Sequence, residues 1–477
     1  MPLAFAPFAI YPVALFGLGV LFWLMLPDTP GSRWLYGYWF GVGLFGAGVP
    51  WVYVSMYYFG GVILPVAIAL TILFALFLSL YPALAAWSTR YFQGLSRYWL
   101  LLGVFPAIWV LVEWVKGWMF TGFPWLNLGY SQIDAPLKGY APILGVYGVS
   151  WLVALSAGLL LLSILDRRRR NLQRLLPVLA ALWITGAALE YVPWTAPVGE
   201  PLRVTLVQGN VGQDVKWLPE QRQPTIERYL SMTERNWDSD IVLWPETAMP
   251  FYYHQGSEFL QALAAKARAT NTEMLLGLPV YEQATGRYFN SMVRLGNGAP
   301  AFYHKRHLVP FGEYMPLKSV LGGLVDFMNI PMSDFSSSKT PPHNLMLAGV
   351  PMAIGICYED VFGEELIDYL PEAGVLVNAS NDAWFGRSVA PHQHLQIARM
   401  RSLEVARPML RVTNTGVTAL IDFRGKVTRA LAQFETAFLT GNVQARTGST
   451  PYVIWGNYPV VIIALGVLFA AYRCRQG

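Results

Sequence analysis

The chain has 477 residues, of which 54% are hydrophobic and only 13% are charged, whereas a soluble domain carries about 25% charged residues. So little charge cannot cover a soluble surface, which excludes a disordered chain and a secreted disulfide scaffold, and much of the chain must face lipid. Residues 1–198 hold ten Lys or Arg and five Asp or Glu, which accounts for the whole net charge of +5. This excess lies in loops between apolar segments, an arrangement typical of the positive-inside rule and not of nucleic-acid binding.

Seven apolar segments approach the roughly 20 residues that a helix needs to cross a bilayer. Glu113 and Lys116 lie near the end of the fourth segment, and charges at such a depth are expected at the membrane interface or in the interior of the bundle. The predicted spans are 8–26, 34–54, 63–87, 98–116, 145–165, 172–192 and 452–472.

The basic loops predict the orientation of these spans. Residues 167–170 are four arginines between the fifth and sixth spans, residues 90–97 carry two more arginines between the third and fourth, and Arg473 follows the last span. If the spans alternate, all of these residues lie on one side, which we expect to be cytoplasmic. The segments 117–144 and 195–450 then face outward.

Seven spans with a cytoplasmic C-terminus place the N-terminus outside. No basic stretch of the kind that opens a signal peptide precedes the first apolar segment. We therefore expect either an exported N-terminus or a chain that begins after a missing first helix.

From residue 201 onward, short β-rich runs alternate with helical stretches, which predicts an α/β domain. The strands are mostly continuous apolar runs, typical of sheets that helices cover on at least one face. The expected strands are 203–208, 239–244, 273–278, 352–357 and 375–378, and the expected helices are 219–236, 257–270, 360–370 and 392–406. Three parts follow: a transmembrane helical bundle over 1–198, a catalytic domain over 199–450, and a last transmembrane helix with its tail over 451–477.

The chain has only two cysteines, and the predicted topology places them on opposite sides of the membrane. Cys474 follows the last span among basic residues and is interpreted as an inert juxtamembrane thiol, with palmitoylation as the alternative. Cys357 ends a strand-like run and is followed by Tyr358, Glu359 and Asp360. A side chain on such a strand-to-helix turn can be an exposed nucleophile, and the alternative is a buried cysteine at the end of a strand.

A cysteine nucleophile needs a base for its proton and donors for the oxyanion that forms after attack. His392 and His394 could form a metal pair, but no ligand motif accompanies them, so we expect no zinc. Glu246, which ends an apolar run, and Lys305, which precedes another, offer a carboxylate and a cation instead.

Glu246, Lys305 and Cys357, in this order along the chain, resemble the Glu-Lys-Cys triad of the nitrilase superfamily. The surrounding motifs resemble those of its membrane-bound branch, the apolipoprotein N-acyltransferase family. The matching segments are 206–210, 244–246, 304–314, 356–359 and 380–386, with 48–54 and 121–126 in the membrane part. This resemblance implies a polytopic α-helical transmembrane bundle, usually of eight helices, that carries an extracytoplasmic α/β domain with an αββα sandwich. The seven predicted spans fall one short of that number.

The resemblance also implies two acyl transfers through one thioester. Cys357 would attack an ester of a phospholipid, typically phosphatidylethanolamine, and the α-amine of a diacylglyceryl-modified cysteine at the N-terminus of an apolipoprotein would then take the acyl chain. Glu246 would act as the general base, and Lys305 would stabilise the oxyanion. The enzyme would complete bacterial lipoprotein maturation in the inner membrane, with its catalytic domain in the periplasm. We expect a monomer without cofactor, metal or nucleic-acid partner.

Four residues form a second tier in this resemblance. Glu313 matches an extra pocket glutamate of nitrilases that can orient Lys305 or the acceptor amine. Glu359 could fix the turn at Cys357 by hydrogen bonds, or could form an ordinary structural pair. Tyr358 and Trp217 match aromatic positions near the family's active site, and simple packing is the alternative for both.

A bilayer substrate needs a path to the nucleophile. Residues 317–328 place apolar side chains on one helical face, with Leu317, Leu321, Leu324 and Met328 among them. Such a face can pack on a core, but in a membrane protein it is also typical of an interfacial arm that admits acyl chains. Two adjacent glycines within it weaken the helix and could act as a hinge.

Two other functions are compatible with parts of the sequence. A membrane-tethered nitrilase-type amidase that hydrolyses a small amide would use the same three residues, with water as the acceptor. A transporter or scaffold would have lost catalysis, and the presence of Glu246, Lys305 and Cys357 argues against it. The membrane motifs and the apolar face at 317–328 argue against the amidase.

Overall fold

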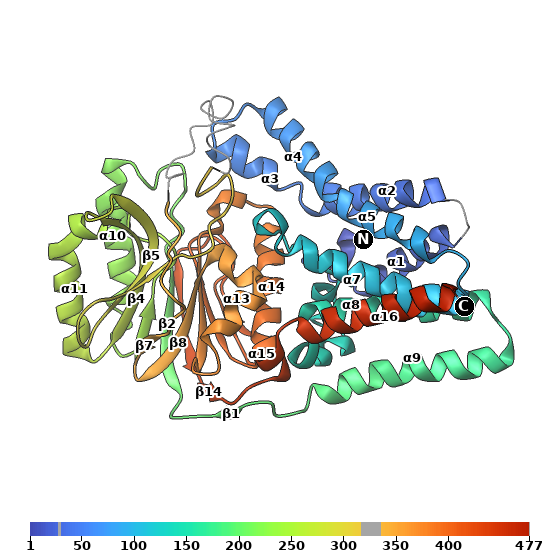
Figure 1. The fold of residues 1–477 in the computed structure, drawn as a ribbon. Coiled ribbons are helices and arrows are strands. Elements are labelled where there is room, and N and C mark those ends of the chain that lie inside the picture. The colour runs from blue at the N-terminus through green and yellow to red at the C-terminus, as the bar shows by residue number, and fades with distance from the viewer. Residues whose placement is uncertain (27–29, 316–334, 477) are drawn as a thin grey trace. The chain divides into compact units, whose positions relative to one another are not determined.

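The computed structural model describes residues 1–26, 30–315 and 335–476. The chain forms two compact units (Figure 1). The first comprises Met1–Tyr53, Pro65–Trp194 and Thr450–Gly477, and the second comprises Val54–Leu64 and Thr195–Ser449. A short segment between two apolar helices therefore belongs to the α/β unit.

Most of the first unit is helical. Its helices are α1 (Pro12–Met25), α2 (Pro30–Gly48), α3 (Val52–Val54), α4 (Leu64–Leu78), α5 (Leu80–Ser88), α6 (Arg97–Trp99), α7 (Phe105–Lys116), α8 (Ala141–Leu165), α9 (Arg169–Leu189), α15 (Pro451–Trp455) and α16 (Tyr458–Gln476), with α3 and α4 crossing the boundary to the second unit. Within the described residues, five helical segments are long and apolar enough to cross a membrane, or six if a bent pair counts as one span. The five are Leu64–Phe92, Arg97–Lys116, Pro136–Leu165, Arg169–Leu189 and Tyr458–Gln476.

The first predicted span is shorter than expected. Instead of running over 8–26, the helix covers only the 14 residues Pro12–Met25. Pro12 is the first helical residue, a position where proline is favoured because its missing N–H would be unpaired there in any case. The segment is therefore an apolar helix below the usual spanning length of about 20 residues.

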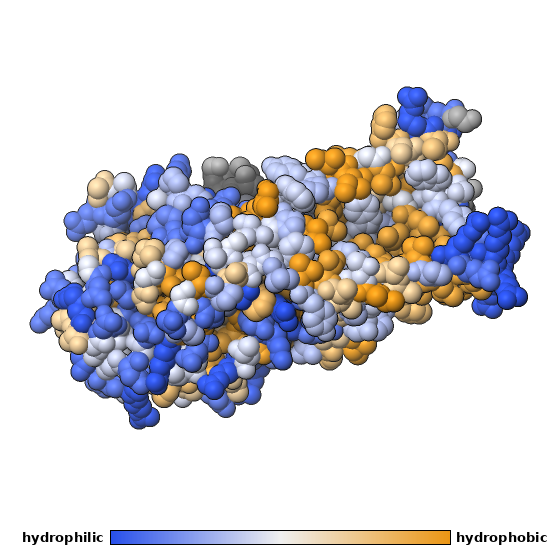
Figure 2. Space-filling view, turned by 90° about the horizontal axis from the view of Figure 1, so that it is seen from below, coloured by the Kyte–Doolittle hydropathy of each residue, from blue (hydrophilic) through white to orange (hydrophobic). Residues whose placement is uncertain are grey.

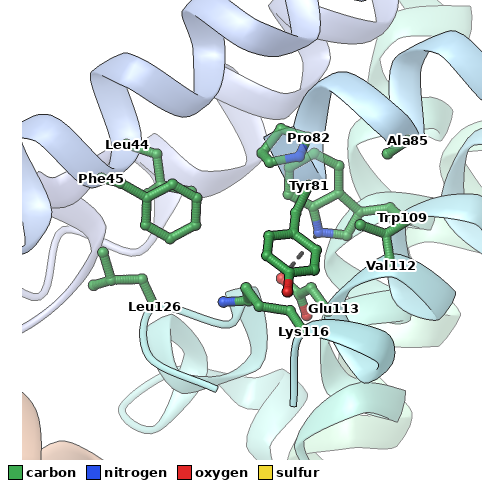
Figure 3. A pocket seen from close by; sticks show the side chains of 10 residues that line it. All are labelled: Leu44, Phe45, Tyr81, Pro82, Ala85, Trp109, Val112, Glu113, Lys116 and Leu126. Atoms are coloured by element: carbon green, nitrogen blue, oxygen red, sulfur yellow. Dashed lines mark hydrogen bonds between the residues drawn. The ribbon is translucent and has the colours of Figure 1, made fainter. Parts of the chain in front are cut away.

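Much of the face of the helical unit that Figure 2 shows is apolar, whereas its far end is hydrophilic. Phe16, Ile184 and Phe469 are 75%, 68% and 66% exposed, which a soluble surface would seldom tolerate over such an area. Glu113 and Lys116, by contrast, are buried in the bundle interior, and Figure 3 shows both beside a mainly apolar pocket. The Glu113 carboxylate accepts the Leu128 N–H at 2.9 Å, and Lys116 donates to the Trp125 carbonyl at 2.6 Å, so these charges anchor the loop after α7.

The basic segments of this unit meet at one end. Arg475 donates to the carbonyl of Tyr91 at 2.6 Å, and the Tyr98 hydroxyl donates to Asp166 at 3.3 Å. Asp166 directly precedes the four arginines at 167–170. The loop at 90–97, the loop at 166–170 and the C-terminal tail therefore lie together.

The second unit contains two six-stranded sheets with helices on their outer faces, giving αββα layers (Figure 1). The first sheet has the order β13-β2-β3-β4-β5-β6, and the second has the order β12-β11-β10-β9-β8-β7. In each, three central strands run parallel, namely β2, β3 and β4 in the first and β8, β9 and β10 in the second. The strands of the first sheet are β2 (Leu202–Gln208), β3 (Ile241–Leu243), β4 (Glu273–Glu282), β5 (Arg287–Leu295), β6 (Ala301–His304) and β13 (Ala437–Val443).

The second sheet and the helices complete the layers. The strands are β7 (Leu345–Leu347), β8 (Val350–Ile356), β9 (Val375–Ser380), β10 (Met409–Thr413), β11 (Ala419–Ile421) and β12 (Val427–Ala430), and β1 (Ala196–Pro197) pairs separately with β14 (Arg446–Thr447). Helices α10 (Pro219–Thr233) and α11 (Ser257–Thr270) cover the first sheet, and α14 (Ala390–Val405) covers the second. Buried Trp244, Tyr229 and Leu263 join the first sheet to its helices in one apolar core.

One predicted helix is largely wrong. Residues 360–370 contain only the short helix α13 (Gly363–Leu366), with 3₁₀ turns η9 (Cys357–Val361) and η10 (Ile367–Tyr369) on either side. The preceding strand β8 ends at Ile356, so Cys357 opens the turn and is not part of the strand. The Glu359 carboxylate accepts hydrogen bonds from main-chain N–H groups, including that of Ile356, and these bonds favour this turn over a regular helix.

Candidate active site

Glu246 follows the buried strand β3, at an end of the first sheet. Its side chain is buried, and two donors fix both oxygens: the Asn290 side-chain amide lies 2.7 Å from Oε1, and the Asn381 main-chain N–H lies 2.8 Å from Oε2. Asn290 comes from β5 of the same sheet, whereas Asn381 directly follows β9 of the other sheet. The carboxylate therefore has a single orientation set from both layers.

Lys305 follows β6 and is only 1% exposed. Its ammonium group lies 2.9 Å and 2.8 Å from the two oxygens of Glu313 and 3.6 Å from Oε1 of Glu246. Burial alone lowers the pKa of Lys305, but the carboxylates of Glu313 and Glu246 outweigh it and the pKa is raised. The lysine is therefore a fixed cation between two carboxylates.

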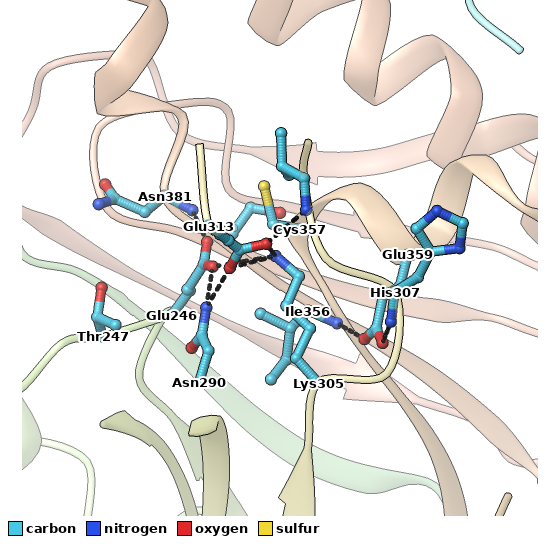
Figure 4. Close-up of polar contacts among 12 residues, drawn as sticks. Glu246, Thr247, Asn290, Lys305, His307, Glu313, Ile356, Cys357, Glu359 and Asn381 are labelled. Carbon is cyan, nitrogen blue, oxygen red and sulfur yellow. Dashed lines mark hydrogen bonds and ion pairs between the residues drawn. The ribbon is translucent and has the colours of Figure 1, made fainter. Parts of the chain in front are cut away.

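Cys357 opens the turn η9 with a left-handed backbone, φ = 53°, which is uncommon for a residue with a side chain. Figure 4 shows its sulfur among the side chains of Glu246, Lys305 and Glu313. Burial, followed by the charge of Glu246, raises the pKa of the Cys357 thiol well above its usual range, although Lys305 acts in the opposite direction. The group is therefore a protonated thiol at rest, and a reaction at the sulfur needs a base to remove its proton.

Glu359 ties the nucleophile turn to the lysine segment. Its oxygens accept main-chain N–H groups of Ile356 at 2.7 Å and Arg306 at 2.7 Å, and the Tyr303 hydroxyl at 2.9 Å. Burial raises the pKa of Glu359, while Lys305 and the N–H donors lower it. Of the two interpretations made from the sequence, hydrogen bonding at the turn describes this residue.

The other sequence-predicted residues lie at varied positions. Tyr358 is buried, and its ring packs edge-on against Phe362 with centroids 5.1 Å apart. Trp217 is half-buried in the turn before α10. The four residues of the expected lipid path, Leu317, Leu321, Leu324 and Met328, lie outside the described residues.

Three polar residues around Glu246 were not predicted. Asn290 contacts both Glu246 and Glu313, the latter at 3.0 Å, and Asn381 holds Glu246 from the second sheet. Lys216 is buried and donates to the Thr247 hydroxyl at 2.8 Å; burial lowers its pKa to about 8, although Glu246 acts to raise it. The sequence around Asn290 gives no signal for its role, because the polar Ser291 follows it directly in the same strand.

Metal ligands can be considered from the same contacts. Over residues 1–26, 30–315 and 335–476, no group of three or more His, Cys, Asp or Glu side chains is arranged to hold a metal ion. His394 is instead held by hydrogen bonds to the carboxylates of Asp360 and Asp382, at 2.9 Å and 3.0 Å.

The cluster combines a thiol, a buried carboxylate and a fixed cation. A carboxylate can take the proton of the thiol, and an ammonium group can stabilise the negative oxygen of a tetrahedral intermediate. These are the requirements of acyl transfer through a covalent thioester.

Known proteins are similar to this chain in sequence over its whole length and in structure over part of it. Residues 1–159 match the family of apolipoprotein N-acyltransferase N-terminal domains, and residues 203–452 match the carbon-nitrogen hydrolase family. An apolipoprotein N-acyltransferase of Methylococcus capsulatus is 48% identical over 100% of this chain and 94% of its own length. Proteins of the same name from Nitrosomonas europaea and Coxiella burnetii are 45% and 41% identical, each over 98% of this chain and over 93% and 96% of their own lengths. Among solved structures, a carbon-nitrogen hydrolase of Helicobacter pylori is 13% identical with a TM-score of 0.40, over 51% of this chain and 88% of its own.

Proposed function

The chain belongs to the apolipoprotein N-acyltransferase family, and from this premise we propose how its residues transfer an acyl chain. It is an acyltransferase that acylates the N-terminal amine of lipoproteins, and its second unit has the nitrilase-like fold. We assign the nucleophile to Cys357, the general base to Glu246 and the oxyanion cation to Lys305. The observation that carries this assignment is the buried contact of Lys305 with two carboxylates beside the left-handed Cys357.

The first half-reaction forms a thioester. Glu246 takes the proton of the Cys357 thiol as the sulfur attacks the ester carbonyl of a phospholipid, and Lys305 stabilises the oxyanion. The C–O bond of the ester then breaks, and the lysophospholipid leaves with the proton that Glu246 returns. Removal of one oxyanion donor typically raises the activation barrier by about 3–4 kcal/mol. Lys305 is therefore expected to account for a large part of the rate enhancement.

The second half-reaction forms the amide. The α-amine of the diacylglyceryl-modified cysteine attacks the thioester, a C–N bond forms, and the C–S bond breaks. Glu246 accepts the amine proton and returns it to the Cys357 sulfur, which restores the resting thiol. Glu313 and Glu359 support these steps by holding Lys305 and the turn at Cys357.

We further propose the setting of the reaction. The donor is phosphatidylethanolamine, and the enzyme is a monomer in the bacterial inner membrane. The catalytic domain over 199–450, which in sequence follows the bundle over 1–198 and precedes the last helix over 451–477, lies in the periplasm. Tyr358 and Trp217 line the approach to the nucleophile. On sequence pattern alone, the apolar face with Leu317, Leu321, Leu324 and Met328 admits the acyl chain.

The experiment is intact-protein mass spectrometry after incubation with phosphatidylethanolamine in detergent micelles. We expect one acyl adduct, mapped to Cys357, that a diacylated lipopeptide discharges rapidly and water discharges slowly. Substitution Cys357→Ser should abolish both the thioester adduct and the acylated lipopeptide, while Cys474→Ser should change neither. Rapid discharge by water without lipopeptide would favour an amidase, and turnover by the Cys357→Ser variant would refute the assignment.

A further inference from the structure

A second cluster of charged side chains lies beside the nucleophile turn and takes no part in the chemistry above. It consists of Asp360, Asp382, His394 and Arg411, each at most 4% exposed. His394 lies between the two carboxylates, with Nε2 2.9 Å from Asp360 and Nδ1 3.0 Å from Asp382. Arg411 contacts the same two residues at 3.3 Å and 3.1 Å. These residues come from η9, the turn after β9, α14 and β10, so the cluster joins four elements of one unit.

This cluster holds the main chain of the nucleophile. His394 Nε2 donates to the Cys357 carbonyl at 3.3 Å, and the Asn378 side chain donates to the same oxygen at 3.1 Å. Asn378 is in turn held by Arg411, which donates to its Oδ1 at 2.5 Å. A left-handed residue such as Cys357 persists only where its surroundings fix it, and these two donors fix its carbonyl.

The same cluster also reaches the general base. Asp382 follows Asn381, whose N–H donates to Glu246 Oε2 at 2.8 Å. Because His394 and Arg411 hold Asp382, they hold the turn that carries this N–H. The sulfur-bearing residue and the carboxylate that takes its proton are thus positioned by one buried assembly.

The charges of the cluster balance when His394 is protonated. The pKa of His394 is raised to about 9: burial and Arg411 lower it, but Asp360 and Asp382 outweigh them. Two cations then face two carboxylates, and both ring nitrogens of His394 are donors. A neutral side chain in its place would leave two buried carboxylates with Arg411 as the one cation of the four-residue cluster.

We propose that His394 is a positioning residue that sets the geometry between the Cys357 sulfur and the Glu246 carboxylate. The inference rests on the proposed function, because it needs Cys357 as nucleophile and Glu246 as base. His394 acts through the Cys357 carbonyl and the Asp382 turn, without contact to substrate. Its loss should therefore lower the rate of the chemical step and leave substrate affinity unchanged.

The first test compares His394→Gln with His392→Gln, a half-buried histidine two residues earlier on α14. The rate of acyl-enzyme formation from phosphatidylethanolamine is measured by intact-protein mass spectrometry over a range of lipid concentrations. We expect His394→Gln to lower the maximal rate about 10- to 100-fold, the size of effect that small misplacements of reacting groups produce, with KM within about twofold. His392→Gln should stay within about twofold in both. An unchanged maximal rate in His394→Gln, or a loss confined to KM, would overturn the proposal.

A second variant keeps the test valid if His394→Gln does not fold. Asn378→Asp retains the acceptor oxygen for Arg411 and for Ser380, but it replaces the donor to the Cys357 carbonyl by a carboxylate oxygen and adds a negative charge to the cluster. It should also lower the maximal rate of the folded protein at least about tenfold, with thermal unfolding used to show that the variant is folded at the assay temperature, and a wild-type rate would refute the positioning role. Absence of any adduct in the wild-type enzyme would refute the proposed function itself, whereas equal adduct formation in wild type and variants would refute the positioning role alone.

Discussion

At the residue scale, Glu246 has two opposite effects on the nucleophile. Its charge raises the pKa of the Cys357 thiol, so it lowers the fraction of reactive thiolate at a given pH. In the proposed mechanism, it is also the base that removes the thiol proton as the bond to substrate forms. The two effects can be separated, because a small neutral alkylating reagent reacts with the thiolate and needs no base.

We therefore predict that Glu246→Gln speeds the alkylation of Cys357 and strongly slows its acylation. Without the carboxylate charge, the pKa of Cys357 falls relative to wild type, so the pH at which iodoacetamide reacts at half its maximal rate should move to lower pH. Acyl-enzyme formation from phospholipid should fall at least about 100-fold, the lower range for loss of general-base catalysis. Peptide mass spectrometry follows both reactions, and the exposed Cys474 in the same molecule is the control for reagent activity. Slower alkylation of Cys357 in the variant would contradict the electrostatic role given to Glu246.

Several site residues could be predicted from the sequence, because they lie in short motifs with recognisable residue types and order. Glu246, Lys305 and Cys357 are such residues, and the structure brings their side chains together. Asn290 and His394 contact the site only through tertiary structure: Asn290 comes from β5, which β4 separates from β3 in the sheet, and His394 comes from a helix, 37 positions after the nucleophile. Nothing in the local sequence could distinguish them from ordinary buried polar residues.

At the element scale, the position of Glu246 depends on how closely β4 packs against the segment that follows β3. Gly277 on β4 lies against the segment that follows β3, and a Cβ atom there would come within 2.3 Å of the Pro245 carbonyl and 2.7 Å of the Glu246 Cα. Both contacts are shorter than any real Cβ tolerates, and both are with main-chain atoms. Only glycine allows β4 to run this close to the base.

Gly277→Ala should therefore reduce activity by moving Glu246. We expect a loss of about 10- to 100-fold in the rate of acyl-enzyme formation and a stability cost of about 1–3 kcal/mol, typical of overpacking. Gly355→Ala on β8 is the matched control, since its Cβ would meet other atoms no closer than 3.8 Å. Kinetics and thermal unfolding of both variants check this, and full activity of Gly277→Ala would mean that the Glu246 segment can shift without consequence.

The elements that sequence patterns predicted best were those with an uninterrupted apolar run. The strands expected at 203–208, 273–278 and 375–378 agree with β2, β4 and β9 in position. The helix expected at 360–370 was wrong because the side chain of Glu359 binds main-chain N–H groups and Asp360 pairs with His394, contacts that no periodicity reveals.

At the scale of the whole molecule, composition separated a lipid-facing part from an α/β part, but the division is not a simple cut. Residues 54–64 belong to the second unit although they lie between apolar helices. Ser55 donates to the Trp384 carbonyl at 2.8 Å, and the Phe59 ring packs edge-on against Trp384. Hydropathy reports only how apolar a segment is, so it could not show that residues 54–64 pack with the α/β unit.

The proposed orientation follows from charge at one end of the helical unit. Arginine at the centre of a bilayer costs about 2.5–3.5 kcal/mol on insertion scales, so the four arginines at 167–170 should remain on the side of synthesis. The contact of Arg475 with the Tyr91 carbonyl places the C-terminal tail at the same end as the 90–97 loop. The tail and the arginine loop should therefore both be cytoplasmic.

Cysteine labelling in spheroplasts tests this orientation. Cys357→Ser leaves Cys474 as the single thiol, and a membrane-impermeant maleimide should label it only after the inner membrane is permeabilised. In a second variant, Glu258→Cys on the exposed surface of α11 is the single thiol, with both native cysteines replaced by serine; it should be labelled in intact spheroplasts. Because Cys474 and position 258 are both exposed, a difference in labelling reports the side of the membrane and not burial. Labelling of Cys474 in intact spheroplasts would invert the proposed topology and place the acyl-transfer site in the cytoplasm.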